Sequence, residues 1–370
     1  IDKPEIEFEN TNDFNFIDMY KKAGENLYDM IKSKVFIKDE QECFYIYTIG
    51  YNGKLQRGLA VCTSIDDYLK DTIKKHEHTL HDKEMDRINH VTYTGAHTGP
   101  IMMTYKKDYE ISSILEEWMK LHEPVYDFTT DENISQKIWV VNDKRTIQRL
   151  IDLFAGIQSL YIADGHHRAA AAVKVGQNMR LKFQNYTGLE EFNFFLSVLF
   201  PSDELTILDY NRLIKDLNGK TYKEIINEVS QKFEIFYQGD KVFRPTKKHT
   251  FGMYINGRWY GLSAKPGSFD DGDPVKSLDV SILHNNIIST IFDINDPRRD
   301  GRIEFVGGIK GLKELQRYVD AGEMKIAFAL YPTSIEELMN IADTGDVMPP
   351  KSTWFEPKLR SGLLIHLLNE

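Results

Sequence analysis

The stretch YIADGHHRAAAAVKV, residues 161–175, joins an apolar run to a series of alanines through a short polar turn. The apolar run at 160–163 is short and branched, which predicts a buried strand, and the alanines favour a helix over 169–175. Asp164 and Gly165 then form the turn between strand and helix. The first turn of the helix would contain three basic side chains, those of His166, His167 and Arg168.

Basic side chains at the start of a helix are unexpected on grounds of helix stability. The first turn exposes unpaired backbone N–H groups and the positive end of the helix dipole, so it favours an anion. A bound anion such as phosphate would resolve the conflict. The alternative is that Asp164 caps the helix and pairs with Arg168, while both histidines lie at the surface. The residues alone leave both interpretations open.

The rest of the chain mixes helical and extended patterns. Asn-Gly pairs between apolar runs predict two hairpins, with tips at Asn52-Gly53 and Asn256-Gly257. Apolar periodicity predicts helices, and Ser334 with Glu337 forms a capping box at the start of the last of them. The predicted helices cover 14–33, 110–121, 143–156, 222–235, 278–292 and 334–345.

The order of these elements does not alternate strictly between strand and helix, which favours an α+β fold with mixed sheets over a doubly wound sheet. A chain of 370 residues is long for a single core. We therefore predict two domains, with a boundary in the turn near residue 200. The N-terminal domain would span 1–199 and a C-terminal α+β domain would span 200–370.

Composition narrows the classes of function. An apolar fraction of 41% and a charged fraction of 28% are typical of a soluble globular protein. The net charge of −10 argues against nucleic acid as a partner. No apolar run is long enough to span a membrane and no signal peptide is visible, so we expect a cytoplasmic protein. Cys43 and Cys62 are expected to be reduced and buried. The oligomeric state is not predicted.

A second polar motif is KKHEHTLHDKEMDR, residues 74–87. Its histidines, His76, His78 and His81, lack the HExxH spacing of a zinc helix, and a solvated charged helix is the more frequent explanation. We therefore assign no metal ligand here. Glu77 is the candidate for a general base or a Mg²⁺-organising carboxylate, because phosphoryl transfer needs such a group near the phosphate.

Two further loops are candidates for phosphate binding. Thr98 and Gly99 could offer a hydroxyl and a backbone N–H, although Gly-Pro loops are usually only turns. The proline-stiffened loop at 348–362 carries hydrogen-bonding groups at Lys351, Ser352 and Thr353, and it could equally be a structural tail held by its aromatic residues. The sequence contains no P-loop, dinucleotide-binding or nucleophile-elbow motif.

Five ordered motifs together resemble the bacterial and archaeal family catalogued as domain of unknown function 1015. They are KKHEHTLHDKEMDR, TGAHTGPIMMTY, YIADGHHRAAAA, EFVGG and VMPPKSTWFEPKLRSGLLIH. The sequence from Asp164 to Arg168 also resembles the phosphate-binding box of the ParB and sulfiredoxin superfamily, which includes nucleotide-dependent free serine kinases. The resemblance implies a ParB/sulfiredoxin-like core in the N-terminal half and a further segment ahead of Ile1.

The resemblance implies a protein that binds a nucleotide or a phosphate and transfers a phosphoryl group to a small molecule such as serine. Mg²⁺ and ATP or ADP would be the cofactors. Arg168, Gly165 and the backbone N–H groups would hold phosphate, with His166 lining the site. His167 and Glu77 would act in catalysis, and Asp164 would orient them. The alternative is a nucleotide-responsive regulatory protein without turnover; the residues do not decide whether the protein is an enzyme.

Overall fold

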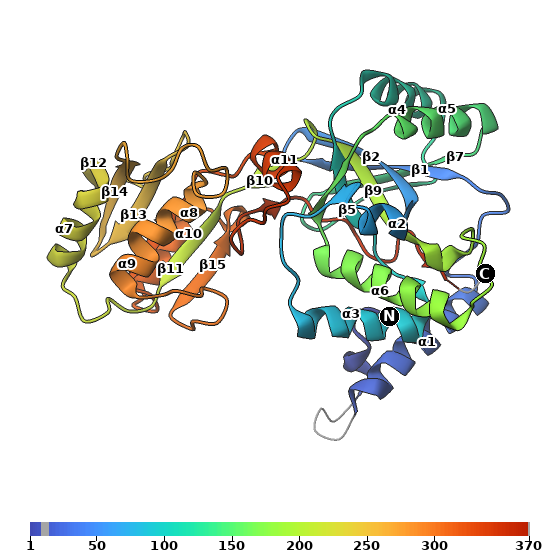
Figure 1. Cartoon of the computed structure of the whole chain (residues 1–370), viewed down its shortest axis with the longest axis horizontal. Helices are drawn as coiled ribbons and strands as arrows, with labels where there is room; N and C mark the ends of the chain where they lie inside the picture. Colours follow the sequence, from blue (N-terminus) through green and yellow to red (C-terminus); the bar gives the residue numbers. More distant parts are fainter. Residues whose placement is uncertain (9–14, 369–370) are drawn as a thin grey trace. The chain divides into compact units, whose positions relative to one another are not determined.

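The chain folds into two compact units in the computed structural model, which describes residues 1–8 and 15–368 (Figure 1). The first unit contains residues 1–205 and 357–370, and the second contains 206–356. Both units combine sheets with helices, so the α+β class predicted from the sequence is confirmed. The return of residues 357–370 to the first unit was not predicted.

The first unit is built on a mixed sheet of eight strands in the order β3-β8-β5-β9-β2-β1-β7-β6. Two neighbouring pairs are parallel, β3 with β8 and β5 with β9, and the other pairs are antiparallel. The strands are β1 (Phe44–Tyr51), β2 (Lys54–Ser64), β3 (Ile73–Lys74), β5 (Ile101–Tyr105), β6 (Tyr126–Thr129), β7 (Ser135–Val141), β8 (Leu160–Asp164) and β9 (Phe194–Pro201).

The helices of this unit form two groups. Helices α1 (Phe16–Lys32), α3 (His81–Thr94) and α6 (His166–Lys182) lie side by side, and α4 (Tyr109–Leu121) packs on α5 (Lys144–Ala155) (Figure 1). The short α2 (Ile65–Leu69) follows β2 directly. Among the described residues, no helix has the length and apolar composition that crossing a membrane requires.

The alanine run has a structural reason. Helix α6 is buried on two sides: Ala169 and Ala172 belong to the core beneath the sheet, while Ala171 and Val175 pack with α3. Small side chains allow close approach on both sides. At Gly176 a Cβ would lie only 2.5 Å from the carbonyl oxygen of Phe192. The helix that follows the polar turn is therefore closely packed on both sides.

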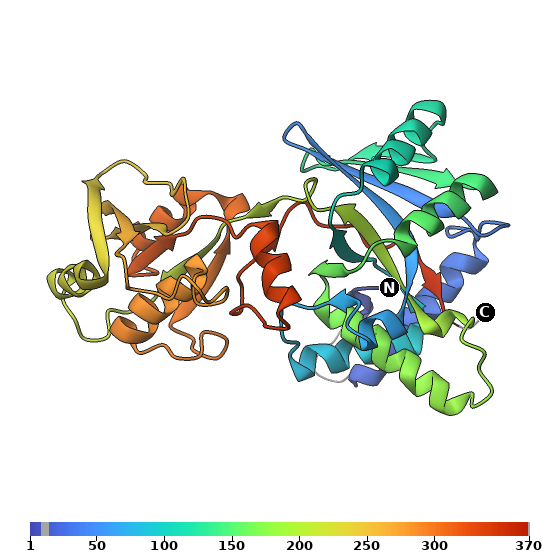
Figure 2. The ribbon, with the colours of Figure 1, turned by 45° about the horizontal axis from the view of Figure 1, so that its top comes forward.

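The C-terminal segment contributes a strand to the first unit. Strand β18 (His366–Leu367) pairs with β4 (Ala96–His97), and Figure 2 shows it among the elements of this unit. Two short 3₁₀ turns, η1 (Pro4–Glu7) and η2 (Glu191–Asn193), complete the unit. Residues that precede and residues that follow the second unit in the sequence therefore fold together as the first unit.

The second unit contains an antiparallel sheet in the order β12-β14-β13-β16-β11-β15 and a small pair of β10 with β17. Helix α10 packs on the sheet through an apolar core. The strands are β10 (Ile207–Leu208), β11 (Tyr210–Ile214), β12 (Phe233–Gly239), β13 (Thr250–Ile255), β14 (Arg258–Ala264), β15 (Ile303–Gly307), β16 (Ile326–Ala329) and β17 (Trp354–Phe355). The helical segments are α7 (Tyr222–Lys232), α8 (Asp279–Leu283), a π turn (His284–Ile288), α9 (Ser289–Phe292), η4 (Gly308–Lys310), α10 (Leu312–Asp320) and α11 (Ile335–Asp343).

Several local predictions are confirmed. Both Asn-Gly pairs lie at hairpin tips with positive φ, and Ser334 and Glu337 form the predicted capping box. The charged motif at 74–87 is helical only from His81 onward, where α3 begins. The prediction that both cysteines are buried is wrong. Neither cysteine is fully buried: Cys43 is half-buried and Cys62 is exposed on β2.

Candidate phosphate-binding turn

The turn between β8 and α6 has the geometry that the sequence suggests. Strand β8 ends at Asp164, and Gly165 takes the N-cap position of α6 with φ of 104° and no side-chain cap. The alternative in which Asp164 caps the helix is therefore wrong. Asp164 does pair with Arg168, but loosely, at 3.8 Å between Oδ2 and Nη2. The first turn of α6 contains no acidic side chain.

Glycine is required at position 165 for two reasons. Its φ lies in the left-handed region, which L-residues rarely adopt. A Cβ there would also approach Nε and Nη2 of Arg168 to 3.2 Å. Because Gly165 has no side chain, the Arg168 guanidinium can pack against the backbone at the start of the helix.

Changing Gly165 to Ala is expected to cost about 1–2 kcal/mol of folding free energy through its φ alone, and to displace Arg168 as well. Gly188 is a matched control, because its φ is 97° and nothing lies within 4 Å of a Cβ placed there. Urea unfolding of the two variants should show a larger loss for Gly165→Ala. Equal losses would mean that the contact with Arg168 has no energetic consequence.

The two histidines of the turn are neutral hydrogen-bond acceptors. His166 Nε2 accepts from the backbone N–H of His76 at 3.4 Å, and His167 Nε2 accepts from that of Leu80 at 3.0 Å. A ring nitrogen that accepts carries no proton, so each imidazole has its proton on Nδ1. The expectation of three cations is wrong: Arg168 is the cation of this trio.

Burial reinforces the neutral state of His166. His166 and His76 are buried and meet edge to face, with ring centroids 4.4 Å apart. Burial, followed by the neighbouring imidazoles of His76 and His167, holds the pKa of His166 well below its ordinary value. Burial lowers the pKa of His76 to about 4. The backbone N–H groups of His76 and Leu80 bond to the rings of His166 and His167. Residues 75–80 therefore lie as an extended segment over the start of α6, and we call this segment the cover.

The loop at 97–100 lies directly against Arg168. The guanidinium Nη1 donates to the carbonyl of Pro100 at 2.8 Å. At Gly99 a Cβ would lie 2.8 Å from Ser361 Oγ and 3.2 Å from Arg168 Nη1, so any larger residue would displace one of these side chains. The two predicted candidates in this loop, Thr98 and Gly99, both lie beside the turn. The Thr98 hydroxyl, however, already donates its proton to Asp2 Oδ1, at 2.7 Å.

Asp2 is a carboxylate that the sequence analysis missed. Burial raises its pKa, but hydrogen bonds from Thr98 and Ser361 and the charge of His90 outweigh burial, so the net shift is downward. Asp164 and Asp2 both favour the charged form of Arg168, whose pKa burial lowers. Glu77, the predicted carboxylate, is half-buried in the extended segment beside His76.

The C-terminal loop divides between the two units. Lys358 Nζ lies 3.3 Å from Asp164 Oδ1 and adds a second cation to the turn, and Ser361 contacts Gly99. The predicted residues Lys351, Ser352 and Thr353 belong instead to the second unit. The reason is that β17 pairs with β10, which keeps the first part of the loop in the second unit.

Within the second unit, the loop from Pro349 to Ser352 has its own contacts. Ser352 is buried and donates its hydroxyl to the carbonyl of Pro349 at 2.6 Å, while the carbonyl of Lys351 accepts from the buried Arg212 at 3.0 Å. A cavity of about 300 Å³ borders Arg212 and His284 there. These residues therefore serve this unit's own packing.

Several solved structures show a distant likeness to the chain. A free serine kinase in complex with AMP is 15% identical, covering 80% of this chain and 86% of that chain with a TM-score of 0.39. A variant of a free serine kinase in complex with ADP is 16% identical, covering 80% and 87% with a TM-score of 0.41. A conserved hypothetical protein from Pyrococcus furiosus is 15% identical, covering 82% and 93% with a TM-score of 0.39. At these sequence identities and TM-scores, the similarity gives no evidence about the candidate site.

A match to a protein-family model is more informative. No curated protein matches the chain. The model described as protein of unknown function DUF1015, however, matches residues 1–281, well over half of the chain. This range contains the turn at 164–168, the cover at 75–80 and the loop at 97–100. The chain therefore belongs to the DUF1015 family, as its motifs led us to expect.

Proposed function

We propose that the turn between β8 and α6 binds the phosphate of a nucleotide, and that the protein transfers a phosphoryl group from ATP or ADP to a small metabolite such as serine. The observation that carries the proposal is the pairing of an uncapped helix start with the half-buried guanidinium of Arg168. Both features favour an anion, and the guanidinium is suited to a phosphate because it donates through two parallel N–H groups.

Each neighbouring group has a role in this proposal. Lys358 supplies a second positive charge, and Asp164 holds Lys358 and Arg168 on either side of its carboxylate. His167 would donate from Nδ1–H to a phosphoryl oxygen, because its Nε2 accepts from Leu80. His167 therefore stabilises charge as a neutral donor, and His166 positions the cover at 75–80.

Mg²⁺ fits the residues present. Carboxylate oxygens and substrate phosphates are its preferred ligands, and the partly exposed side chains of Asp2 and Asp164 lie at the turn. Mg²⁺ would neutralise charge on the transferring phosphoryl group. The identity of the general base stays a prediction. Glu77 and Asp2 are the two candidates, and of these Asp2 is the one whose charge acts on the pKa of Arg168.

The second candidate function is a nucleotide-responsive protein without turnover. It is favoured by the two histidines, whose Nε2 atoms hold the backbone of residues 76–80. Such bonds couple the anion site to an extended segment, which is what a conformational readout of nucleotide binding would need. The two proposals share the same anion site and differ in whether a product forms.

Incubation of the protein with Mg²⁺, ATP or ADP and a panel of amino acids separates them. Phosphoryl transfer predicts a phosphorylated amino acid, seen by mass spectrometry and by release of ADP or AMP. A thermal shift with nucleotide but no product would overturn the transferase and support the regulator. No thermal shift with any nucleotide or with inorganic phosphate would overturn both.

A further inference from the structure

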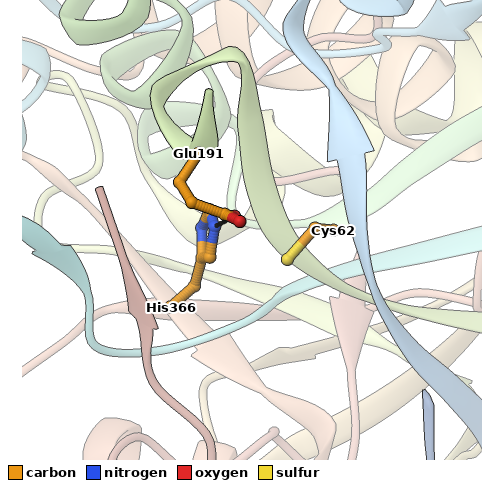
Figure 3. Close-up of side chains that lie close together, drawn as sticks. All are labelled: Cys62, Glu191 and His366. Carbon is orange, nitrogen blue, oxygen red and sulfur yellow. Dashed lines mark hydrogen bonds and ion pairs between the residues drawn. The ribbon is translucent and has the colours of Figure 1, made fainter. Parts of the chain in front are cut away.

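Three potential metal ligands meet in the first unit, and none of them belongs to the phosphate-binding turn. Cys62 on β2, Glu191 at the start of η2 and His366 on β18 place their ligand atoms within 4.8 Å of one another. Figure 3 shows the side chains of Glu191 and His366 meeting, with the sulfur of Cys62 directed toward the pair. A thiolate, an imidazole and a carboxylate are the three ligand types that zinc uses in proteins.

His366 is oriented as a metal-binding histidine would be. Its Nε2 faces Glu191 Oε2 at 2.6 Å, and its Nδ1 lies 3.1 Å from Nδ1 of His97. Metal-ligating histidines usually form a hydrogen bond through the nitrogen that does not bind the metal, which fixes the ring. His97 is buried and supplies that partner through its Nδ1.

The cluster is also accessible from solvent. Cys62 is exposed and Glu191 is half-buried, while His366 is buried. A cation can therefore enter from the side of Cys62, and a fourth ligand such as water can bind there. A bound cation would displace the thiol proton and bind the thiolate.

We propose that Cys62, Glu191 and His366 bind one zinc-class divalent cation. The three ligands come from β2, from the turn before β9 and from the returning C-terminal segment. The cation thus fastens β18 to the main sheet of the first unit and stabilises the unit. The simpler explanation, a hydrogen bond between Glu191 and His366 that holds β18, assigns no role to the thiol.

Cobalt titration of the full chain, stripped of metal with a chelator, tests the site. Thiolate bound to Co²⁺ gives a charge-transfer band in the near ultraviolet, and the chain has only two cysteines. The wild type should show the band, saturating at about one equivalent, and Zn²⁺ should abolish it by displacement. Cys62→Ser should lose the band, whereas the matched control Cys43→Ser should keep it.

Thermal unfolding completes the test. Zn²⁺ should raise the melting temperature of the wild type and of Cys43→Ser by several degrees, and that of Cys62→Ser much less. Both variants change a side chain that is not fully buried, so both are expected to fold. The proposal is overturned if the wild type shows no band, or if the band survives in Cys62→Ser. Equal stabilisation of all three proteins by Zn²⁺ would contradict it as well.

Discussion

Changing Arg168 to Ala is expected to weaken the binding of ATP, ADP and inorganic phosphate by about a hundredfold. Loss of charge-assisted hydrogen bonds to a phosphate costs about 3 kcal/mol, which corresponds to this change in Kd. The effect should be large because the guanidinium is fixed: Nη1 donates to Pro100 and Gly165 packs against Nε and Nη2. Isothermal titration calorimetry at constant salt measures it, and Arg168→Lys should recover only part of the affinity.

Arg180 supplies the matched control for this experiment. It lies in the last turn of the same helix and pairs with Asp66 at 2.7 Å. Arg180→Ala should lower stability modestly and leave nucleotide affinity unchanged. If Arg168→Ala binds nucleotide as tightly as the wild type, the start of α6 is not the phosphate site. An equal loss of affinity in both variants would mean that net charge, rather than the turn, governs binding.

Elements whose conformation depends mainly on residues adjacent in the sequence could be predicted from the sequence. The Asn52-Gly53 hairpin tip needs positive φ at adjacent residues, and asparagine and glycine tolerate it. The junction between β8 and α6 follows from an apolar run, a glycine and an alanine run. The return of residues 357–370 to the first unit could not be predicted, because it depends on the pairing of β18 with β4, which are distant in sequence.

The chemistry of the turn was less predictable than its position. The sequence shows His166 and His167 beside Arg168, but it does not show that backbone N–H groups of residues 76 and 80 reach their rings. These contacts turn two expected cations into neutral acceptors. Asp2 gave no signal, since a lone aspartate near the start of a chain has no pattern. Lys358 and Asp164 each lie within a motif, but the sequence does not show that they pair.

Acidification from pH 7 to pH 4 is expected to destabilise the first unit through its buried histidines. The folded state holds His76 neutral down to a pKa of about 4, whereas the unfolded chain binds a proton near the ordinary value of 6.5. Between these values the unfolded state carries more protons, so stability falls as pH falls. His76 alone contributes about 3 kcal/mol of loss by pH 4. His97 and His166 act in the same direction.

Urea unfolding of the wild type and of His76→Gln between pH 7 and pH 4 measures how much His76 contributes to the loss of stability. The difference between the two proteins is needed because other groups also titrate; burial raises the pKa of Asp279 in the second unit to about 7, which opposes the trend. His76→Gln should be less stable at pH 7 but should lose less stability on acidification. His78→Gln is the matched control, two residues away and exposed, and should follow the wild type. Parallel curves for His76→Gln and the wild type would show that the folded state takes up the proton at His76 as readily as the unfolded chain. The cover over α6 would then open to water in the native state, and neutral His166 could not be what holds it closed.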